Sequence, residues 1–490
     1  MSVPVEPKDT SKSRRPLWRR IVRWMVCVAV TLIVLLVAAW STWNYLATRD
    51  LQAEVQKIRA AGEPVTFAQL AEQRPKPSEG QDAAPYYGAA LLLQRNSEQV
   101  YDALGKCHEI AEDRQAELPA DLVASIQDLL AQNGLALEMI DRGGALPACD
   151  FDIGVEHGIG SALAKLGKAR GPAKLCSLRT AFLAMQGQSD RAAESAMSTL
   201  RMTRMFDAQP IVIACLLKVA CLAMTAGDVP VILEHGSPSR SSLDRLQEAL
   251  LEAEQTIDLR RVWLAERVYC LEVMRNLFSD RRELQAFPGD RPSMPETWPT
   301  SFASGPFVRR MAAAVLRKYA ASVTMAGKDW PEALAAAHWM GSTQPRSWLS
   351  PNLMADVLGP SLSKAMELSA RSVADLRCAR AAVLVDMYRL DMGHLPQTLA
   401  DVEASLGVKL PSDPFTGGAL IYRRTADGYL VYSLGESRQD CGGPSPKRDE
   451  SGNRGYRIHL TASGGTEFLP PRSSPIVGDS PPSEPGNDSH

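Results

Sequence analysis

The segment from Trp24 to Trp43 constrains the chain most, because it contains twenty consecutive residues without a charged side chain. At about 1.5 Å of rise per residue, a helix of this length spans about 30 Å, the thickness of the hydrocarbon core of a bilayer. Trp18 lies before the segment and Tyr45 follows it, as interfacial aromatic residues would. The sequence therefore predicts a transmembrane helix over 24–45.

The charges on either side of this helix predict its orientation. Residues 1–23 contain seven Lys or Arg and two acidic residues, whereas the twenty residues after the span contain three basic residues. The positive-inside bias places the basic tail in the cytoplasm and the bulk of the chain outside it. A cleaved signal peptide has a shorter apolar core and a small-x-small cleavage site, which Val37-Ala38-Ala39-Trp40-Ser41 does not supply. We expect an uncleaved, single-pass signal-anchor in the inner (cytoplasmic) membrane of a bacterial envelope, rather than a signal peptide or the buried helix of a soluble protein.

Charge and cysteine content exclude some classes of function. The first 23 residues sum to +5 and the whole chain to −2, which leaves −7 for the remainder. A mildly acidic remainder argues against nucleic acid as a partner, because binding phosphates requires a basic face. Nine cysteines without a CxxC motif predict neither a zinc knuckle nor a thioredoxin-like redox site. Mostly free, buried thiols are expected, and one or two disulfides are left open.

Proline, glycine and hydrophobic periodicity divide the rest of a chain that we expect to be mainly α-helical. A stalk and Pro-rich linker (46–80) leads to a helical domain (81–285). A Pro- and Gly-rich loop with connecting helices (286–360) follows, then a small α+β module (361–460). The last segment (461–490) is dominated by Pro, Ser and Gly and is expected to be a disordered tail.

Paired helices are the expected unit of the helical domain. The apolar face of residues 175–185 stops at Gly187 and resumes at 193–200, which predicts an αα-hairpin. Successive hairpins loosely resemble tetratricopeptide-like helical envelope proteins, although the Trp, Leu-Gly and Tyr positions of that repeat are missing. An irregular bundle is the alternative. Ile211–Met224 is apolar almost all round with Lys218 in its middle, and we expect a buried helix rather than a second membrane span.

The segment from about 361 to 443 contains a series of recognisable landmarks. A helical stripe ends near Gly393, and two strands joined by an Asp427-Gly428 turn follow. In chain order the landmarks are Tyr388-Arg389, Gly393-His394-Leu395-Pro396, Leu410-Pro411-Ser412-Asp413-Pro414-Phe415, Tyr432-Ser433-Leu434-Gly435 and Gly442-Gly443. This order resembles the globular domain of the major pseudopilin of type II secretion systems. The resemblance implies a helix packed on a small antiparallel sheet and a structural calcium ion in the loop after Ser-Leu-Gly.

The helix of this module carries an apolar stripe that we expect to face the strands. The stripe consists of Val373, Leu376, Val383 and Met387.

The chain also departs from the pseudopilin pattern. Its span has no prepilin junction and no acidic residue, and more than three hundred residues separate the span from the module, so assembly into a pilus is not expected. Ser437 stands where the family has a calcium-binding aspartate, which leaves Leu434 (through its carbonyl), Ser437 and Asp440 as metal ligands. Because Ca²⁺ usually takes several carboxylates, a loop that has lost the metal is preferred over one that binds it weakly.

No catalytic constellation can be read from the sequence. The motifs GxSxG, GxxxxGK[ST], HExxH and GxGxxG are absent, and the seven histidines are scattered. We therefore predict no catalytic residue and no organic cofactor. The preferred hypothesis is a non-catalytic scaffold that binds other envelope proteins, because helical arrays offer extended surfaces. An accessory component of a type II secretion-like apparatus and an envelope hydrolase with an unrecognised site are the alternatives.

Overall fold

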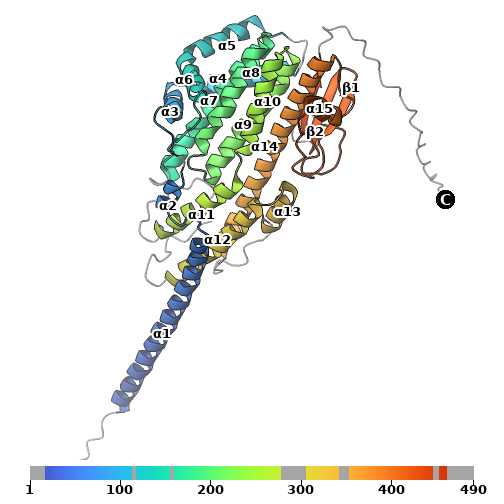
Figure 1. Cartoon of the computed structure of the whole chain (residues 1–490). Helices are drawn as coiled ribbons and strands as arrows, with labels where there is room; N and C mark the ends of the chain where they lie inside the picture. The colour runs from blue at the N-terminus through green and yellow to red at the C-terminus, as the bar shows by residue number, and fades with distance from the viewer. Residues whose placement is uncertain are drawn as a thin grey trace, which may run out of the picture.

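The computed structural model describes residues 17–74, 76–112, 117–154, 159–276, 305–341, 352–444 and 452–460. Within these ranges the protein has fifteen α-helices and one three-stranded sheet, so it is mainly helical, as the sequence predicts. One long helix projects from the end of a helical bundle, and the sheet lies at the side of that bundle (Figure 1). The predicted tail at 461–490 lies outside the described residues, as do 286–304 and 342–351 of the segment predicted as a loop with connecting helices (286–360).

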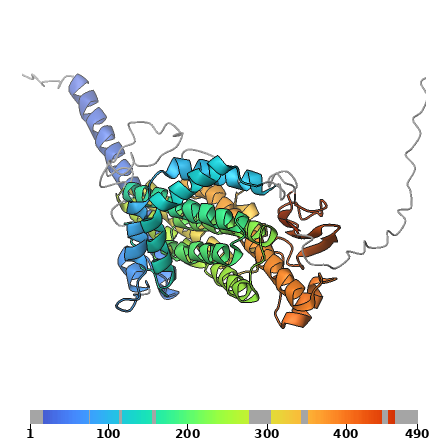
Figure 2. The ribbon, with the colours of Figure 1, turned by 90° about the horizontal axis from the view of Figure 1, so that it is seen from above.

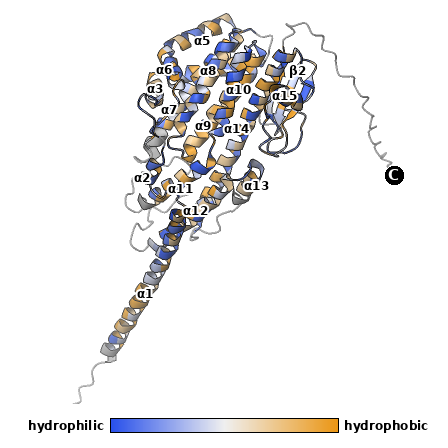
Figure 3. Cartoon of the chain, viewed as in Figure 1, coloured by the Kyte–Doolittle hydropathy of each residue, from blue (hydrophilic) through white to orange (hydrophobic). Residues whose placement is uncertain are grey.

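The projecting helix is α1 (Leu17–Ala60), which contains the predicted membrane span and continues beyond it without a break. Its apolar side chains between Trp24 and Val37 are exposed, and none of its most apolar 18-residue window is buried by the rest of the protein. Figure 3 shows this apolar stretch projecting from the bundle. By length and composition α1 is able to cross a membrane. This agrees with the anchor expected near the N-terminus.

The outer end of α1 is packed against the bundle. Arg309 of α12 (Gly305–Ala326) donates a hydrogen bond from Nη1 to Asn44 Oδ1 at 2.5 Å. Six and ten residues further along α1, Asp50 and Glu54 both pair with Arg317 of α12, at 3.3 and 3.4 Å. The expected helical stalk therefore lies along α12 instead of standing free.

The segment after α1 is held by α11 (Leu259–Asn276). The Glu63 carboxylate pairs with Arg260 at 2.9 Å and with Arg267 at 2.7 Å, and Arg267 also donates to the carbonyl of Pro64 at 3.0 Å. Arg267 is completely buried. A buried ion pair thus holds the chain at the point where it passes from α1 into the bundle.

The bundle combines hairpins of consecutive helices with interfaces between helices that are far apart in sequence. Gly187 has a φ of +71°, which ends one helix and allows the next to begin at Ser189, so the predicted hairpin is present. The helices not yet named are α2 (Phe67–Glu72), α3 (Ala84–Leu93), α4 (Ser97–Ala111), α5 (Ala120–Gln132), α6 (Gly134–Gly144), α7 (Ile159–Met185), α8 (Ser189–Met202), α9 (Val212–Glu234), α10 (Arg240–Gln255) and α13 (Trp330–Gly341).

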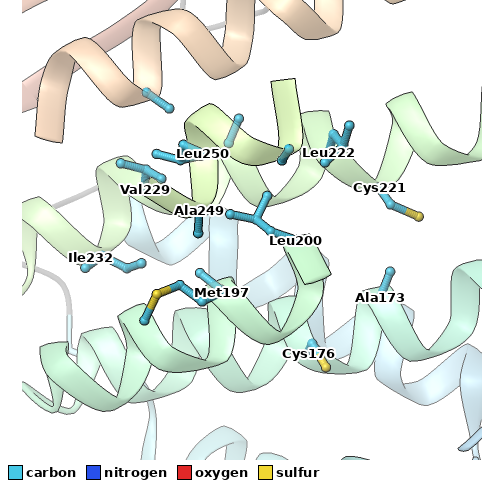
Figure 4. Close-up of a cluster of buried hydrophobic side chains, with 14 of the residues drawn as sticks. Ala173, Cys176, Met197, Leu200, Cys221, Leu222, Val229, Ile232, Ala249 and Leu250 are labelled. Carbon is cyan, nitrogen blue, oxygen red and sulfur yellow. The ribbon is translucent and has the colours of Figure 1, made fainter. Parts of the chain in front are cut away.

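The second apolar helix of the chain, α9, lies inside the bundle. Although its composition would also allow it to cross a membrane, more than half of its most apolar window is buried by other helices. Leu222 and Val229 of α9 belong to one buried cluster with Met197 and Leu200 of α8 and Leu250 of α10 (Figure 4). As predicted, α9 is a core helix.

The C-terminal part of the described chain combines one long helix with the sheet. The elements are α14 (Leu353–Met392), α15 (Leu399–Leu406), β1 (Ile421–Thr425), β2 (Gly428–Ser433) and β3 (Arg454–His459). The strands are antiparallel in the order β1-β2-β3, with Tyr422 opposite Val431 and Val431 opposite Tyr456. The sequence predicted β1 and β2 but not β3, which is short and carries two arginines among its six residues.

One face of α14 contacts the sheet through polar groups. Asp375 is buried and forms a two-pronged ion pair with Arg454 of β3, at 2.7 and 3.1 Å. The Cys378 thiol donates to the Arg454 carbonyl, and the Tyr429 hydroxyl of β2 donates to the Ala382 carbonyl at 3.0 Å. Because these positions on α14 are three or four residues apart, they define the side of the helix that faces the strands.

The apolar stripe of α14 faces the other way. Ser372 donates to the Val219 carbonyl of α9 at 3.1 Å, and Leu376 and Val383 follow at four and eleven residues along the same side. Val373 and Met387 also lie away from the strand side at the helical spacing of 100° per residue, so the expectation that this stripe faces the strands is wrong for all four residues. Figure 2 shows α14 between the sheet and the helices of the bundle. One continuous apolar core extends from α3 to β3.

Candidate functional site

The predicted calcium loop, residues 434–444, follows β2. The Leu434 carbonyl accepts hydrogen bonds from Ser437 Oγ at 3.1 Å and from Asn453 Nδ2 at 3.0 Å. The Gln439 carbonyl accepts from the same Asn453 Nδ2 at 2.7 Å. Two of the three predicted ligands, Leu434 and Ser437, are thus close together, but their oxygens are engaged within the protein.

The third predicted ligand, Asp440, is held by a different set of groups. Its carboxylate accepts from the Gly442 N–H and from the Tyr432 hydroxyl, each at 2.9 Å, and pairs with the Arg423 guanidinium. The Gly442 and Tyr432 hydrogen bonds lower the pKa of Asp440, with a further contribution from Arg423. The carboxylate is therefore ionised and already neutralised by an arginine.

These partners do not fit a calcium ion. Ca²⁺ requires six to eight oxygen ligands, commonly from several carboxylates. The loop offers two carboxylates, Asp440 paired with Arg423 and Glu436 paired with Arg371, and two carbonyls occupied by an amide. Throughout the ranges that the structure describes, no group of three or more His, Cys, Asp or Glu side chains is arranged to hold a metal ion.

The Asp-Pro-Phe landmark before β1 has a structural role. The Asp413 carboxylate is buried and accepts from the Ser433 hydroxyl at 2.7 Å, and from the backbone N–H groups of Leu434 and Phe415 at 2.9 Å each. It therefore joins the turn before the sheet to the end of β2. This geometry explains why Asp and Ser occur at these two landmarks.

A buried group that the sequence does not reveal lies between α4, α7 and α9. Asp228 is fully buried, and its Oδ1 accepts from Ser177 Oγ at 2.8 Å and lies 3.0 Å from His108 Nε2. The three residue types are those of a hydrolase triad, but the connection is different. In a triad the histidine lies between the serine and the carboxylate so that it can take the serine proton. Here the carboxylate lies between them, so the group joins three helices and the histidine is not in contact with Ser177 as a triad would require.

A cavity of about 250 Å³ lies between α9, α10 and α11. On its wall the ammonium of Lys218 donates to Asp207 at 2.6 Å and to the Thr256 carbonyl at 2.8 Å. Burial raises the pKa of Asp207, and the Lys218 ammonium opposes that shift. The neighbouring thiol of Cys215 also lines the cavity, and burial raises its pKa to about 11, so it stays protonated and is a poor nucleophile at neutral pH.

All nine cysteines are free thiols, as expected for most of them, and no pair forms the disulfides that the sequence left open. Burial raises the pKa of Cys107, Cys149 and Cys221 to about 12 and that of Cys176 to about 11. The buried thiols are accordingly packing groups rather than reactive ones.

An open groove of about 490 Å³ lies between α4 and α5, at the end of the bundle opposite α1 (Figure 1). Lys106 is paired with Asp102 at 2.8 Å, and this hydrogen bond raises the pKa of Lys106. The groove therefore combines three carboxylates and one ammonium with apolar side chains. Its charged lining residues are Glu98, Asp102, Lys106 and Asp128, and its apolar ones are Ala103, Leu122 and Leu129.

No family model, curated protein or solved structure matches this chain. The pseudopilin and tetratricopeptide resemblances therefore rest on the sequence landmarks alone.

Proposed function

We propose that the protein is a single-pass membrane protein of the bacterial envelope whose N-terminus is cytoplasmic and whose large outer part is a non-catalytic scaffold for other envelope proteins. The exposed apolar span of α1 and the basic tail before it support the anchor and its orientation. The packing of α1 on α12 supports a scaffold that is held at a fixed position above the membrane.

The observation that carries the scaffold proposal is the groove between α4 and α5. It lies between two helices at the end of the bundle opposite the anchor, where a partner in the envelope could reach it. Its three carboxylates against one ammonium match a segment rich in Lys or Arg, and Leu122 and Leu129 match an aliphatic side chain on the same segment. We therefore infer that the partner presents a basic, amphipathic segment.

A hydrolase is less well supported. The cavity at Lys218 has a protonated thiol and an ion pair but no histidine among its lining residues, and Ser177 is hydrogen-bonded to a carboxylate instead of a histidine. An accessory role in a type II secretion-like apparatus stays an alternative that rests on the sequence landmarks of α14 and the sheet.

A photocrosslinking experiment in intact cells tests the scaffold proposal. A photoreactive residue replaces Ser125, which lines the groove, or, as the control, Glu332, an exposed residue of α13. We expect a discrete crosslinked protein from position 125 that is lost when Glu98→Lys and Asp128→Lys are added, and no such product from position 332. Equal products from both positions, or a product that survives both charge reversals, would refute the groove as the docking surface.

The orientation has a separate test. An enzyme reporter that is active only outside the cytoplasm, fused after residue 60, is expected to be active, and the full-length protein is expected to resist alkaline extraction. Activity of a cytoplasm-only reporter at the same position would reverse the proposed topology.

A further inference from the structure

Asn453 occupies the centre of the loop after β2. Its side chain is 2% exposed, although the residue stands just before β3 in a region of turns. Its Nδ2 group donates to the carbonyls of Leu434 and Gln439, and its Oδ1 accepts from the Cys441 N–H at 2.8 Å. Every polar atom of this amide is therefore used to close the loop.

The orientation of the amide follows from its partners. If the amide were rotated by 180°, Oδ1 would face two carbonyl oxygens and Nδ2 would face the Cys441 N–H, and all three contacts would become repulsive. The two N–H bonds of Nδ2 thus point at the place where the Leu434 and Gln439 carbonyls converge. Converging carbonyl dipoles need a positive group between them, and here the amide supplies it.

Close packing of the backbone brings Asn453 to this place. Gly435 has a φ of +64°, and a Cβ at this position would lie 1.6 Å from the Gly452 carbonyl oxygen. Gly452 itself has a φ of +68° and lies against the Ser437 side chain. Only a residue pair without side chains allows the two backbone segments to approach so closely. The loop is therefore built around a protein group rather than around an open space.

We propose that the side-chain amide of Asn453 takes the place of a cation in this loop, so that the loop closes without a metal ion. Asn453→Asp is the informative substitution, because it removes the two donors and puts a carboxylate beside two carbonyls and the Ser437 hydroxyl. These are oxygen ligands of the kind that Ca²⁺ binds. Asn453→Ala removes the donors without adding a ligand and is the matched control.

Thermal unfolding of the full-length protein in detergent, in excess EGTA and in millimolar Ca²⁺, tests the proposal. The wild-type melting temperature is expected to be the same in both conditions. Both variants are expected to melt at a lower temperature in EGTA, and Ca²⁺ is expected to restore part of the loss in Asn453→Asp alone. An increase of the wild-type melting temperature in Ca²⁺ would overturn the proposal, because the loop would then bind the metal as well as the amide. Unchanged melting of both variants in EGTA would overturn it as well, because the amide would not be what closes the loop.

Discussion

Truncation of Leu376 is expected to destabilise the whole outer part of the protein and not only the region of the sheet. Leu376 is 1% exposed and lies on the side of α14 that faces α9. Leu376→Ala removes three carbon atoms, and at about 0.8 kcal/mol for each buried CH₂ the transfer term is about 2.4 kcal/mol. Because the sheet covers the opposite side of α14, the helix cannot move far to fill the cavity. A cavity term then brings the expected loss in the free energy of unfolding to about 3–4 kcal/mol.

Urea denaturation of the full-length protein in detergent measures this loss, and native-state hydrogen exchange shows where it is felt. Amide protection is expected to fall together in α9, α10, α14 and β2, because these elements share one core. Leu390→Ala is the matched control, since Leu390 is on the same helix but 41% exposed, and its cost is expected to be below about 0.5 kcal/mol. Loss of protection confined to the sheet and α15, with α9 and α10 unchanged, would refute the shared core.

Three further predictions concern buried charged groups. Burial raises the pKa of Glu266 from 4.5 to about 7, so the folded state holds an extra proton between these pH values and its free energy of unfolding falls as the pH rises through them. The Glu266→Gln variant does not lose this proton. In urea titrations its free energy of unfolding, relative to that of the wild type, should therefore increase by up to about 3 kcal/mol between about pH 4.5 and 7. Asp228→Asn should lower the free energy of unfolding by about 1–3 kcal/mol, because the amide accepts the buried hydrogen bonds less strongly, and an unchanged urea midpoint would contradict this. Arg267→Ala should lower the free energy of unfolding by about 3–5 kcal/mol, because it leaves buried polar groups beside Glu63 without their partner. Arg260 is exposed, so Arg260→Ala should lower it by less than about 1 kcal/mol. Equal shifts of the urea midpoint in the two variants would show that burial of the pair is irrelevant.

Local patterns in the sequence are sufficient to predict several elements. The uncharged run from Trp24 gives α1, the glycine at 187 gives the break between α7 and α8, and the even apolar distribution around Lys218 gives a buried α9. In each case the signal lies within about twenty neighbouring residues. Helix periodicity and caps act over such distances, so a sequence read in short windows contains the information.

The orientation of α14 could not be predicted in this way. Asp375 and Asp386 interrupt its apolar pattern and appear as the solvent side of an amphipathic helix. In the structure both carboxylates are buried, because Arg454 pairs with Asp375 and Arg389 pairs with Asp386. The arginine that pairs with Asp375 is 79 residues away along the chain, so the local pattern does not show that this aspartate is buried. The pattern therefore predicts one buried face for α14, whereas the helix has two.

The loop after β2 shows the same limit at a smaller scale. Residues 433–437 resemble the calcium motif of the pseudopilin family, but they lack one of its carboxylates. The residue that closes the loop, Asn453, is 19 positions after Leu434 and outside that motif. A sequence comparison could register the lost ligand, but only the folded chain reveals the group that lies in its place.

Helix α12 connects two parts of the protein that are far apart in the sequence. More than three hundred residues separate the predicted span from the helix and sheet at the C-terminal end. This separation alone would predict an anchor and a distant, independent module. In the structure α12 packs against α1 on one side and against α14 on another. The C-terminal end of α1 is thus connected to the sheet through three packed interfaces, α1 with α12, α12 with α14 and α14 with the sheet. A partner bound at the bundle or at the sheet would therefore be held at a defined distance from the membrane, which is the property that a scaffold requires and a tethered module lacks.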